Sequence, residues 1–174
     1  DEDGNFDFKK AKKNFGNGNG IGQIGRLSDA GTGNIQTHPW KGRNARQQAE
    51  LSNDVQKFFR EHGRLGIPVI IHEECLHGQA AVDGTSFPQP IALAETFNPE
   101  LVESLYSMVA QEARLRGTHQ ALTPVVDVAR DARWGRVEET FGEDPFLVSR
   151  MGIAACLGFQ GDAKFNNKNK IIST

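Results

Sequence analysis

Apolar residues along this chain alternate between short continuous runs and helical spacing. The short runs lie at residues 21–27, 67–71 and 121–128 and predict buried strands, and Ile171–Thr174 predicts a fourth strand. Residues 43–62 carry apolar side chains on one helical face. Two further helices are predicted after Asn98-Pro99 and Asp144-Pro145, where a capping residue precedes a proline at the first helical position.

The predicted order is strand, loop, helix, repeated three times and followed by a fourth strand. Such alternation indicates a parallel sheet with right-handed crossovers. An open doubly wound sheet and a (β/α)8 barrel both satisfy it, and the long charged loops after the strands favour a barrel. We therefore expect an α/β fold, a partial (β/α)8 TIM barrel of about the first three to four βα units. Residues 1–19 form a polar N-terminal segment with one short helix ending at Gly16, and residues 20–174 form the barrel part.

The stretch from Ala121 to Pro145 carries the densest chemistry. It is predicted to leave a buried strand and enter a loop that also contains Trp134 and Phe141. Its charged residues are Arg130, Asp131, Arg133, Arg136, Glu138, Glu139, Glu143 and Asp144. A strand that ends in charges is how parallel α/β folds present binding groups, and an indole beside them suits a sugar ring. The alternative is a solvated loop whose arginines pair with its own carboxylates.

The second predicted strand also ends in polar residues, Glu73, Glu74 and His77. If the two strands are parallel neighbours, these residues lie beside the charged loop. A carboxylate and a guanidinium in one pocket can hold vicinal hydroxyls by charge-assisted hydrogen bonds. Spacing alone assigns no general acid and no nucleophile.

Three patterns suggest other chemistry. Gly20, Gly22 and Gly25 match the dinucleotide fingerprint, but they precede or lie within a strand, so no helix N-terminus follows them. His72 and His77 resemble a zinc-protease pair, yet they are five residues apart and end a strand. Cys75 stands among acids, which raise rather than lower a thiol's pKa. We expect no nucleotide, no metal and no cofactor.

Composition adds little. Hydrophobic residues make up 37%, charged residues 24%, and the net charge is −2, so neither a nucleic-acid nor a membrane partner is indicated. No segment reaches the about 18 apolar residues of a membrane span. The two cysteines, Cys75 and Cys156, are expected to be separate thiols. The sequence begins without Met, so a cytoplasmic, periplasmic or secreted location stays open.

Three segments together resemble the N-terminal barrel domain of glycoside hydrolase family 3, which includes β-glucosidases, β-xylosidases and N-acetylglucosaminidases. They read IPVIIHEECLHG, TSFPQPIALAETFNPEL and ALTPVVDVARDARWGRVEETFGEDP. The resemblance implies that Glu74 and Arg136 bind hydroxyls of the sugar in the cleavage subsite. It places His77, Arg26, Arg130 and Glu139 around them. Glu74, where many glucosidases of the family have Asp, resembles the β-xylosidase branch.

The resemblance also implies what the chain lacks. The family's sugar-contacting Lys-His pair, its nucleophilic Asp and its general acid lie in segments beyond those present here. Asp127 and Asp131 are not substitutes, because Asp127 is predicted in mid-strand and Asp131 belongs to a turn. We therefore expect no catalytic residue in this chain, which is inactive alone. Its partners would be a β-linked xylo- or gluco-oligosaccharide and the remaining barrel and C-terminal domain. A half-barrel interaction module is the alternative.

Overall fold

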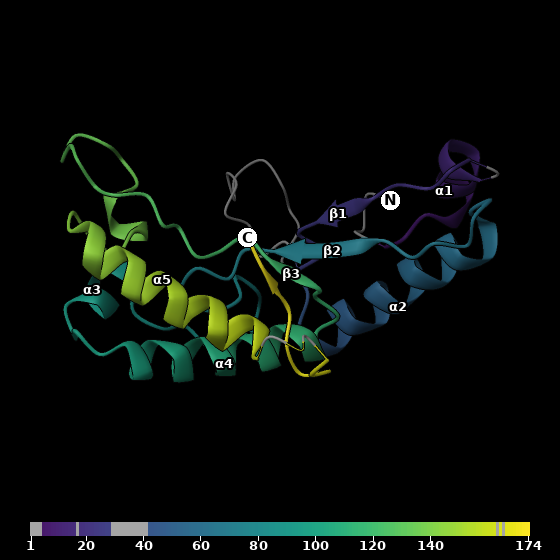
Figure 1. The fold of residues 1–174 in the computed structure, drawn as a ribbon. Helices are drawn as coiled ribbons and strands as arrows, with labels where there is room; N and C mark the ends of the chain where they lie inside the picture. The colour runs from purple at the N-terminus through teal and green to yellow at the C-terminus, as the bar shows by residue number, and fades with distance from the viewer. Residues whose placement is uncertain (1–4, 17, 29–41, 163, 165) are drawn as a thin grey trace.

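The computed structural model describes residues 5–16, 18–28, 42–162, 164 and 166–174. A four-stranded parallel sheet has the order β1 (Gln23–Gly25), β2 (Ile70–Glu73), β3 (Gln120–Ala121) and β4 (Ile172–Ser173). Helices α2 (Ala45–His62), α4 (Pro99–Leu115) and α5 (Pro145–Gln160) connect successive strands (Figure 1). The predicted βα alternation is therefore confirmed, and each strand pairs with the next one along the chain.

Local sequence explains where the three connecting helices begin. Asn44 and Gln47 form a reciprocal capping box at α2, with Asn44 accepting a hydrogen bond from the Gln47 N–H at 2.9 Å. Asn98 and Asp144 cap α4 and α5 by accepting the N–H of Leu101 and of Leu147, and each is followed by proline. A shorter helix, α1 (Phe8–Phe15), begins after its own aspartate cap and ends at Gly16, as predicted.

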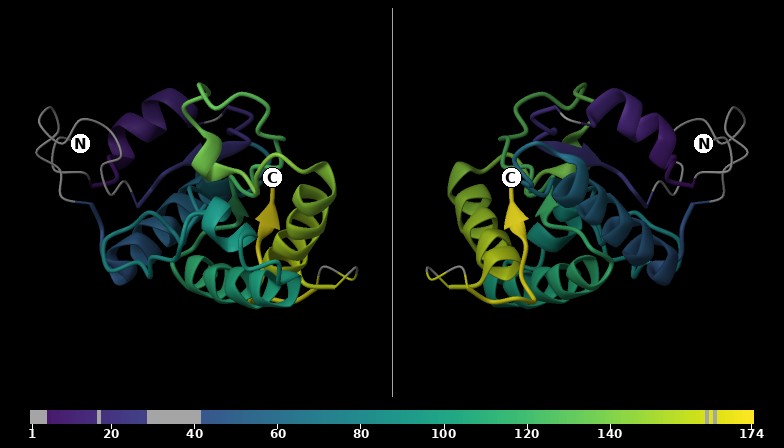
Figure 2. Two further views of the ribbon diagram at one scale, coloured as in Figure 1. Left: turned by 90° about the vertical axis from the view of Figure 1, so that its left-hand side faces the viewer. Right: turned by 90° about the vertical axis from the view of Figure 1, so that its right-hand side faces the viewer.

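The connecting helices lie along the outside of the curved sheet (Figure 2). Two apolar clusters fill the space between helices and sheet. One cluster joins α1 and α2 to β1 and β2, and it is centred on Phe58, Phe59 and Ile71. The other joins α4 and α5 to β3, with Tyr106 and Phe159 in ring contact at 4.8 Å. Burial of these side chains holds the helices on one face of the sheet.

The other face of the sheet carries Ile70 and Ile172, which are 37% and 49% exposed. His72 belongs to this face, and its ring lies across Gly25 on β1. A Cβ at Gly25 would be 2.2 Å from Nε2 of His72, so only glycine allows this approach. The side-chain amide of Gln23 on β1 donates a hydrogen bond to the side-chain oxygen of Gln120 on β3 at 3.3 Å. In a (β/α)8 barrel this face is the interior.

Some predicted boundaries are wrong. The third strand was predicted to continue to Val128 but ends at Ala121, and the chain then runs as extended backbone with Val126 exposed. Pro124 has no N–H to donate to a ladder, which explains the early end. Strand β2 begins at Ile70 rather than Ile67, and Ile67 is exposed.

Two short helices were not predicted, α3 (Pro90–Ala94) and the 3-10 helix η1 (Val137–Glu139). Most of the predicted loop at 28–42 lies outside the described residues. Cys75 and Cys156 are both free thiols, as expected. Among the described residues, no helix is long and apolar enough to cross a membrane.

Candidate functional site

The carboxyl ends of β2 and β3 meet at one edge of the sheet. The two strands pair in parallel with Glu73 beside Ala121, and the N–H of Leu122 donates to the Glu73 carbonyl at 3.0 Å. The segment that begins at Glu74 and the charged loop after Ala121 therefore leave the sheet from neighbouring positions, as the sequence predicts.

Side chains alternate along β2 between the face toward α2 and the opposite face. Ile71 and Glu73 are buried on the side of α2, and Glu73 accepts a hydrogen bond from the Gln48 amide of that helix at 3.1 Å. Glu74 is the first residue after β2, and because successive side chains point to opposite faces, we expect it on the interior face with His72. Glu74 is half-buried. Burial raises the pKa of Glu73, while hydrogen bonds from Ser28 oppose the rise.

Within the charged loop, the arginines do pair with the loop's own carboxylates. Arg133 donates to Asp131 at 2.6 Å, and Asp131 also accepts the Arg133 backbone N–H at 2.9 Å, which makes it part of a tight turn. Arg136 donates from Nε to Glu139 at 2.9 Å and also forms an ion pair with it through Nη2. The solvated-loop interpretation thus describes these two pairs correctly.

Arg136 differs from Arg133 in its surroundings. The hydrogen bond and charge of Glu139 raise the pKa of Arg136 most, and the carboxylates of Glu74 and Asp127 raise it further. For Arg133, only Asp131 raises the pKa. The charge of Glu74, the residue that follows β2, therefore contributes to the raised pKa of Arg136. Glu74 and the charged loop that contains Arg136 follow two neighbouring parallel strands, and a shared sugar site for these two side chains stays a prediction.

Of the four residues predicted around Glu74 and Arg136, Glu139 pairs with Arg136, and the other three have different positions. Arg26 directly follows β1, with its N–H donating to the His72 carbonyl at 2.9 Å and its charge lowering the pKa of Glu73. His77 is half-buried at the start of a turn and accepts the Phe87 N–H at 2.8 Å through its carbonyl. Arg130 is exposed.

Asp127 was predicted in mid-strand, and this prediction is wrong. It lies in the extended segment beyond β3, is exposed, and contributes to the field at Arg136. The apolar run around Asp127 predicted a strand there, but Pro124 cannot donate a hydrogen bond and the strand ends before it.

The other three patterns have structural explanations. Gly20, Gly22 and Gly25 lead into or lie in β1, and no helix begins at their end. Among the described residues, no group of three or more His, Cys, Asp or Glu side chains is arranged to hold a metal. Cys75 is fully buried, and burial raises its pKa with help from the charges of Glu73 and Glu74, so the thiol is inert.

Comparison with known proteins agrees with this fold. The family description "Glycosyl hydrolase family 3 N terminal domain" matches residues 8–174. A β-xylosidase of Formosa agariphila is 46% identical over 133 residues, which cover 72% of this chain and 18% of that protein. Another relative from the same organism is covered over only 15% of its length. The chain thus spans less than a fifth of either relative.

Solved structures show the same fold. A β-glucosidase from Erythrobacter marinus superposes with a TM-score of 0.75 at 33% identity, covering 87% of this chain and 22% of that one. A β-glucosidase from Listeria innocua, in complex with glucose, superposes with a TM-score of 0.69 at 32% identity, covering 87% and 18%.

The parallel sheet and its outer helices are therefore part of a (β/α)8 barrel of the kind found in β-glycosidases. The chain belongs to glycoside hydrolase family 3, within the family's N-terminal domain.

Proposed function

We propose that this chain forms the first part of the barrel, and part of the monosaccharide site, of a retaining exo-acting β-glycosidase that removes terminal β-linked sugars. The observation that supports the proposal is the parallel pairing of β2 and β3, because Glu74 and the charged loop that contains Arg136 follow these two strands, and the charge of Glu74 raises the pKa of Arg136. A carboxylate accepts and a guanidinium donates, so together they suit adjacent sugar hydroxyls. Trp134, 36% exposed in the same loop, offers an apolar face nearby.

We infer that a β-xyloside is the preferred substrate and a β-glucoside the next. Glu74 is one methylene longer than aspartate, and the extra length fills space that a hexose C6 group needs. The β-xylosidase relative from Formosa agariphila supports this choice, while the β-glucosidase structures keep the second substrate open. The discrimination expected from one methylene is about 1–3 kcal/mol, or roughly 10- to 200-fold.

The reaction itself needs groups that we assign to the rest of the protein. Retaining hydrolysis uses two carboxyl groups about 5–5.5 Å apart on either side of the glycosidic bond. Glu74 binds hydroxyls in this proposal, and Asp131 is engaged in its own turn with Arg133. The nucleophile, the general acid, the other barrel units and the C-terminal domain are therefore the chain's proposed partners, and the chain alone is inactive.

The proposal is tested on the protein as its gene encodes it, with aryl β-xyloside as substrate. Losing one hydrogen bond to a charged group costs about 1.5–3 kcal/mol, so Arg136→Ala should lower kcat/KM about 10- to 150-fold. Arg133→Ala is the matched control, since Arg133 lies in the same loop and also pairs with a carboxylate. It should leave kcat/KM within about twofold, as surface ion pairs are weak. Equal losses for both variants would refute the assignment.

Substrate preference is tested separately. Glu74→Asp should raise the ratio of β-glucoside to β-xyloside turnover, because it opens space near C6. An unchanged ratio would contradict the steric argument while leaving the sugar site standing. If the unmodified protein hydrolyses neither substrate, the alternative of a half-barrel interaction module is favoured instead.

A further inference from the structure

Four buried polar side chains form a cluster at the mouth of the sheet, which we call the mouth cluster. Its members are Ser28, Gln48, Glu73 and Gln79, and they are 1%, 0%, 1% and 4% exposed. They come from four different segments: the exit of β1, helix α2, the end of β2, and the loop that follows β2. None of them is among the residues assigned above to the sugar.

Glu73 is the centre of the mouth cluster because three donors converge on its carboxylate. The Ser28 N–H donates to Oε1 at 2.9 Å, and the Ser28 hydroxyl donates to Oε2 at 2.6 Å. The Gln48 amide donates to Oε1 at 3.1 Å. Gln48 in turn accepts the Gln79 amide at 2.9 Å, which extends the chain of bonds into the loop after β2.

These bonds close the base of the loop that begins at Glu74. The N–H of Ala80 donates to the Glu74 carbonyl at 2.9 Å. The Ser28 hydroxyl lies 3.2 Å from the carbonyl of Ala80. Both Gln79 and Ala80 are thus tied to the same cluster that holds Glu73, the residue preceding Glu74. The backbone before and after Glu74 is therefore held by hydrogen bonds to residues on the α2 face of the sheet.

We propose that Glu73 is a positioning residue that fixes the direction in which Glu74 meets the sugar, by joining the β1 exit, α2 and the β2 loop through the mouth cluster. The proposal rests on the proposed function, since Glu74 is taken there to bind a hydroxyl. Glu73 itself faces α2, on the opposite side of the sheet from the sugar, and acts only through the backbone of its neighbour.

A role in stability alone does not explain this arrangement. Burying a carboxylate costs free energy, and apolar residues of similar volume often replace buried charges without loss of stability. Apolar side chains fill the corresponding space elsewhere on β2, where Val69 and Ile71 are buried against α2. A polar cluster gives directed bonds, and a binding site displaced by about 1 Å can lose about 100-fold in rate.

Glutamine at position 73 provides a sharp test because it can keep every bond. Its carbonyl oxygen accepts from the Ser28 N–H and from Gln48, as Oε1 does now. Its amide then donates to the Ser28 oxygen, and the Ser28 hydroxyl turns to the Ala80 carbonyl at 3.2 Å. Glu73→Gln therefore retains the geometry without the charge, whereas Glu73→Ala removes the centre of the cluster.

Gln56 supplies a matched control at the opposite end of the same strand. Its amide donates to the Val69 carbonyl at 2.7 Å, and its oxygen accepts the Val69 N–H at 3.1 Å. The mouth cluster and this contact both join α2 to the β2 segment by side-chain hydrogen bonds. The mouth cluster does so at the end of β2, and the Gln56 contact does so just before its start. It lies at the amino end, away from Glu74, so Gln56→Ala perturbs stability without perturbing the mouth.

The experiment uses the protein as its gene encodes it and measures kcat and KM on aryl β-xyloside and aryl β-glucoside. Glu73→Ala should raise KM about tenfold with kcat changed less than about threefold, and Glu73→Gln should restore KM to within about twofold. Gln56→Ala should lower the melting temperature and leave KM within about twofold. A merely structural role predicts unchanged KM in both alanine variants, and that result would overturn the proposal.

Hydrogen–deuterium exchange gives a second measurement that needs no activity. Glu73→Ala should speed exchange in the peptide covering residues 74–89, while Glu73→Gln and Gln56→Ala leave that peptide protected. If the unmodified protein hydrolyses neither substrate, the proposed function fails and exchange alone decides the structural part of the inference. Unchanged protection at 74–89 in Glu73→Ala would refute it in either case.

Discussion

Two glycines in α5 offer a paired test of how closely this helix packs on α4. A Cβ at Gly158 would lie 2.6 Å from the backbone oxygen of Glu103 and 2.8 Å from Cβ of Tyr106, both on α4. A Cβ at Gly152 would lie 2.8 Å from Cγ1 of Val126, whose side chain is 54% exposed. The first contact can be relieved only by moving a helix, and the second by turning one surface side chain.

The expected sign differs between the two substitutions. Alanine gains about 1 kcal/mol over glycine inside a helix. Overpacking a core costs about 1–3 kcal/mol, and a backbone clash belongs at the upper end. We therefore expect Gly158→Ala to destabilise the protein by about 1–2 kcal/mol. Gly152→Ala should be neutral or more stable by up to about 1 kcal/mol.

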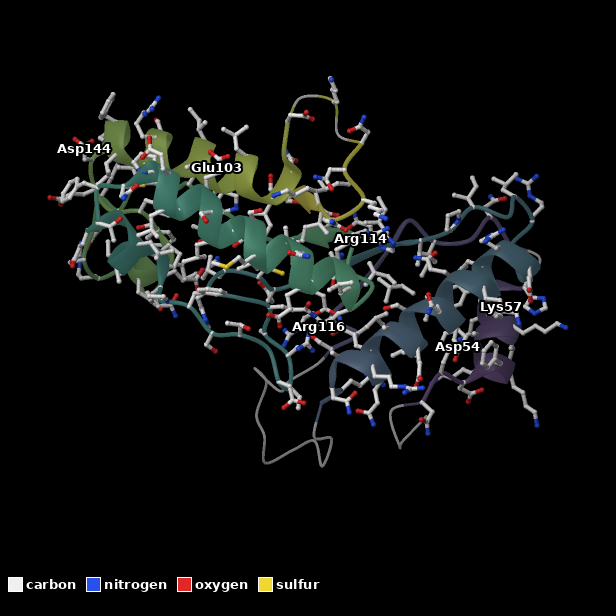
Figure 3. All side chains as sticks on the ribbon, turned by 90° about the horizontal axis from the view of Figure 1, so that it is seen from below. Asp54, Lys57, Glu103, Arg114, Arg116 and Asp144 are labelled. Carbon is white, nitrogen blue, oxygen red and sulfur yellow. The ribbon has the colours of Figure 1, made fainter. Side chains whose placement is uncertain are left out.

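Both variants are made in the protein as its gene encodes it. Calorimetry gives the melting temperature, and hydrogen–deuterium exchange of the peptides covering α4 and α5 locates the change. Gly158→Ala should melt earlier than Gly152→Ala and lose protection in both helices. This matters for the site because α5 begins directly after Asp144, its N-cap, where the charged loop ends. Figure 3 labels Asp144 at the start of α5 and Glu103 on α4. Equal stability of the two variants would contradict the close packing of α5 on α4 at Gly158.

Three smaller predictions concern caps and protonation. Asp144 accepts the Leu147 N–H at 2.7 Å, so Asp144→Ala should cost about 1 kcal/mol in thermal unfolding while Asp144→Asn costs little. His119 accepts the Ile71 N–H through Nδ1 at 3.1 Å, and burial lowers its pKa, so stability should fall as pH drops below 6.5; His119→Asn should lack this fall. Burial raises the pKa of Glu73, so the stability of Glu73→Gln relative to wild type should increase as pH rises above 4.5, and a constant difference would contradict it.

Helix starts could be read from the sequence because their determinants are local. Asn98 and Asp144 each stand directly before a proline, and both cap the helices that follow. Helix α3 was missed because it has five residues and no side-chain cap, so its sequence resembles a turn. The apolar run at 121–128 was misleading, because apolar content does not show where the hydrogen bonds between strands end. Here the strand ends shortly before Pro124, which has no N–H to donate.

Some features of the candidate site could likewise be predicted from the sequence, and others could not. The rule that parallel strands deliver their ends to one edge predicted that Glu74 and Arg136 would share a region. The ion pairing of Arg136 with Glu139 was one of two open alternatives, and only the structure shows that this pair forms. The joint action of Glu74 and Arg136 on a sugar stays a prediction. The mouth cluster could not be predicted, because Ser28, Gln48 and Gln79 meet only through the fold. Period-two alternation with Ile71 was the one available signal that Glu73 faces the helix.

The central claim is that Glu74 and Arg136 act together on one sugar, and a double-mutant cycle tests it most directly. The cycle compares kcat/KM on aryl β-xyloside for Glu74→Gln, Arg136→Ala, the double variant and the unmodified protein as its gene encodes it. Residues that share one ligand should couple by about 0.5–3 kcal/mol, so the double variant should lose less than the two single losses combined. Single losses within about twofold, or strictly additive losses, would contradict a shared monosaccharide site.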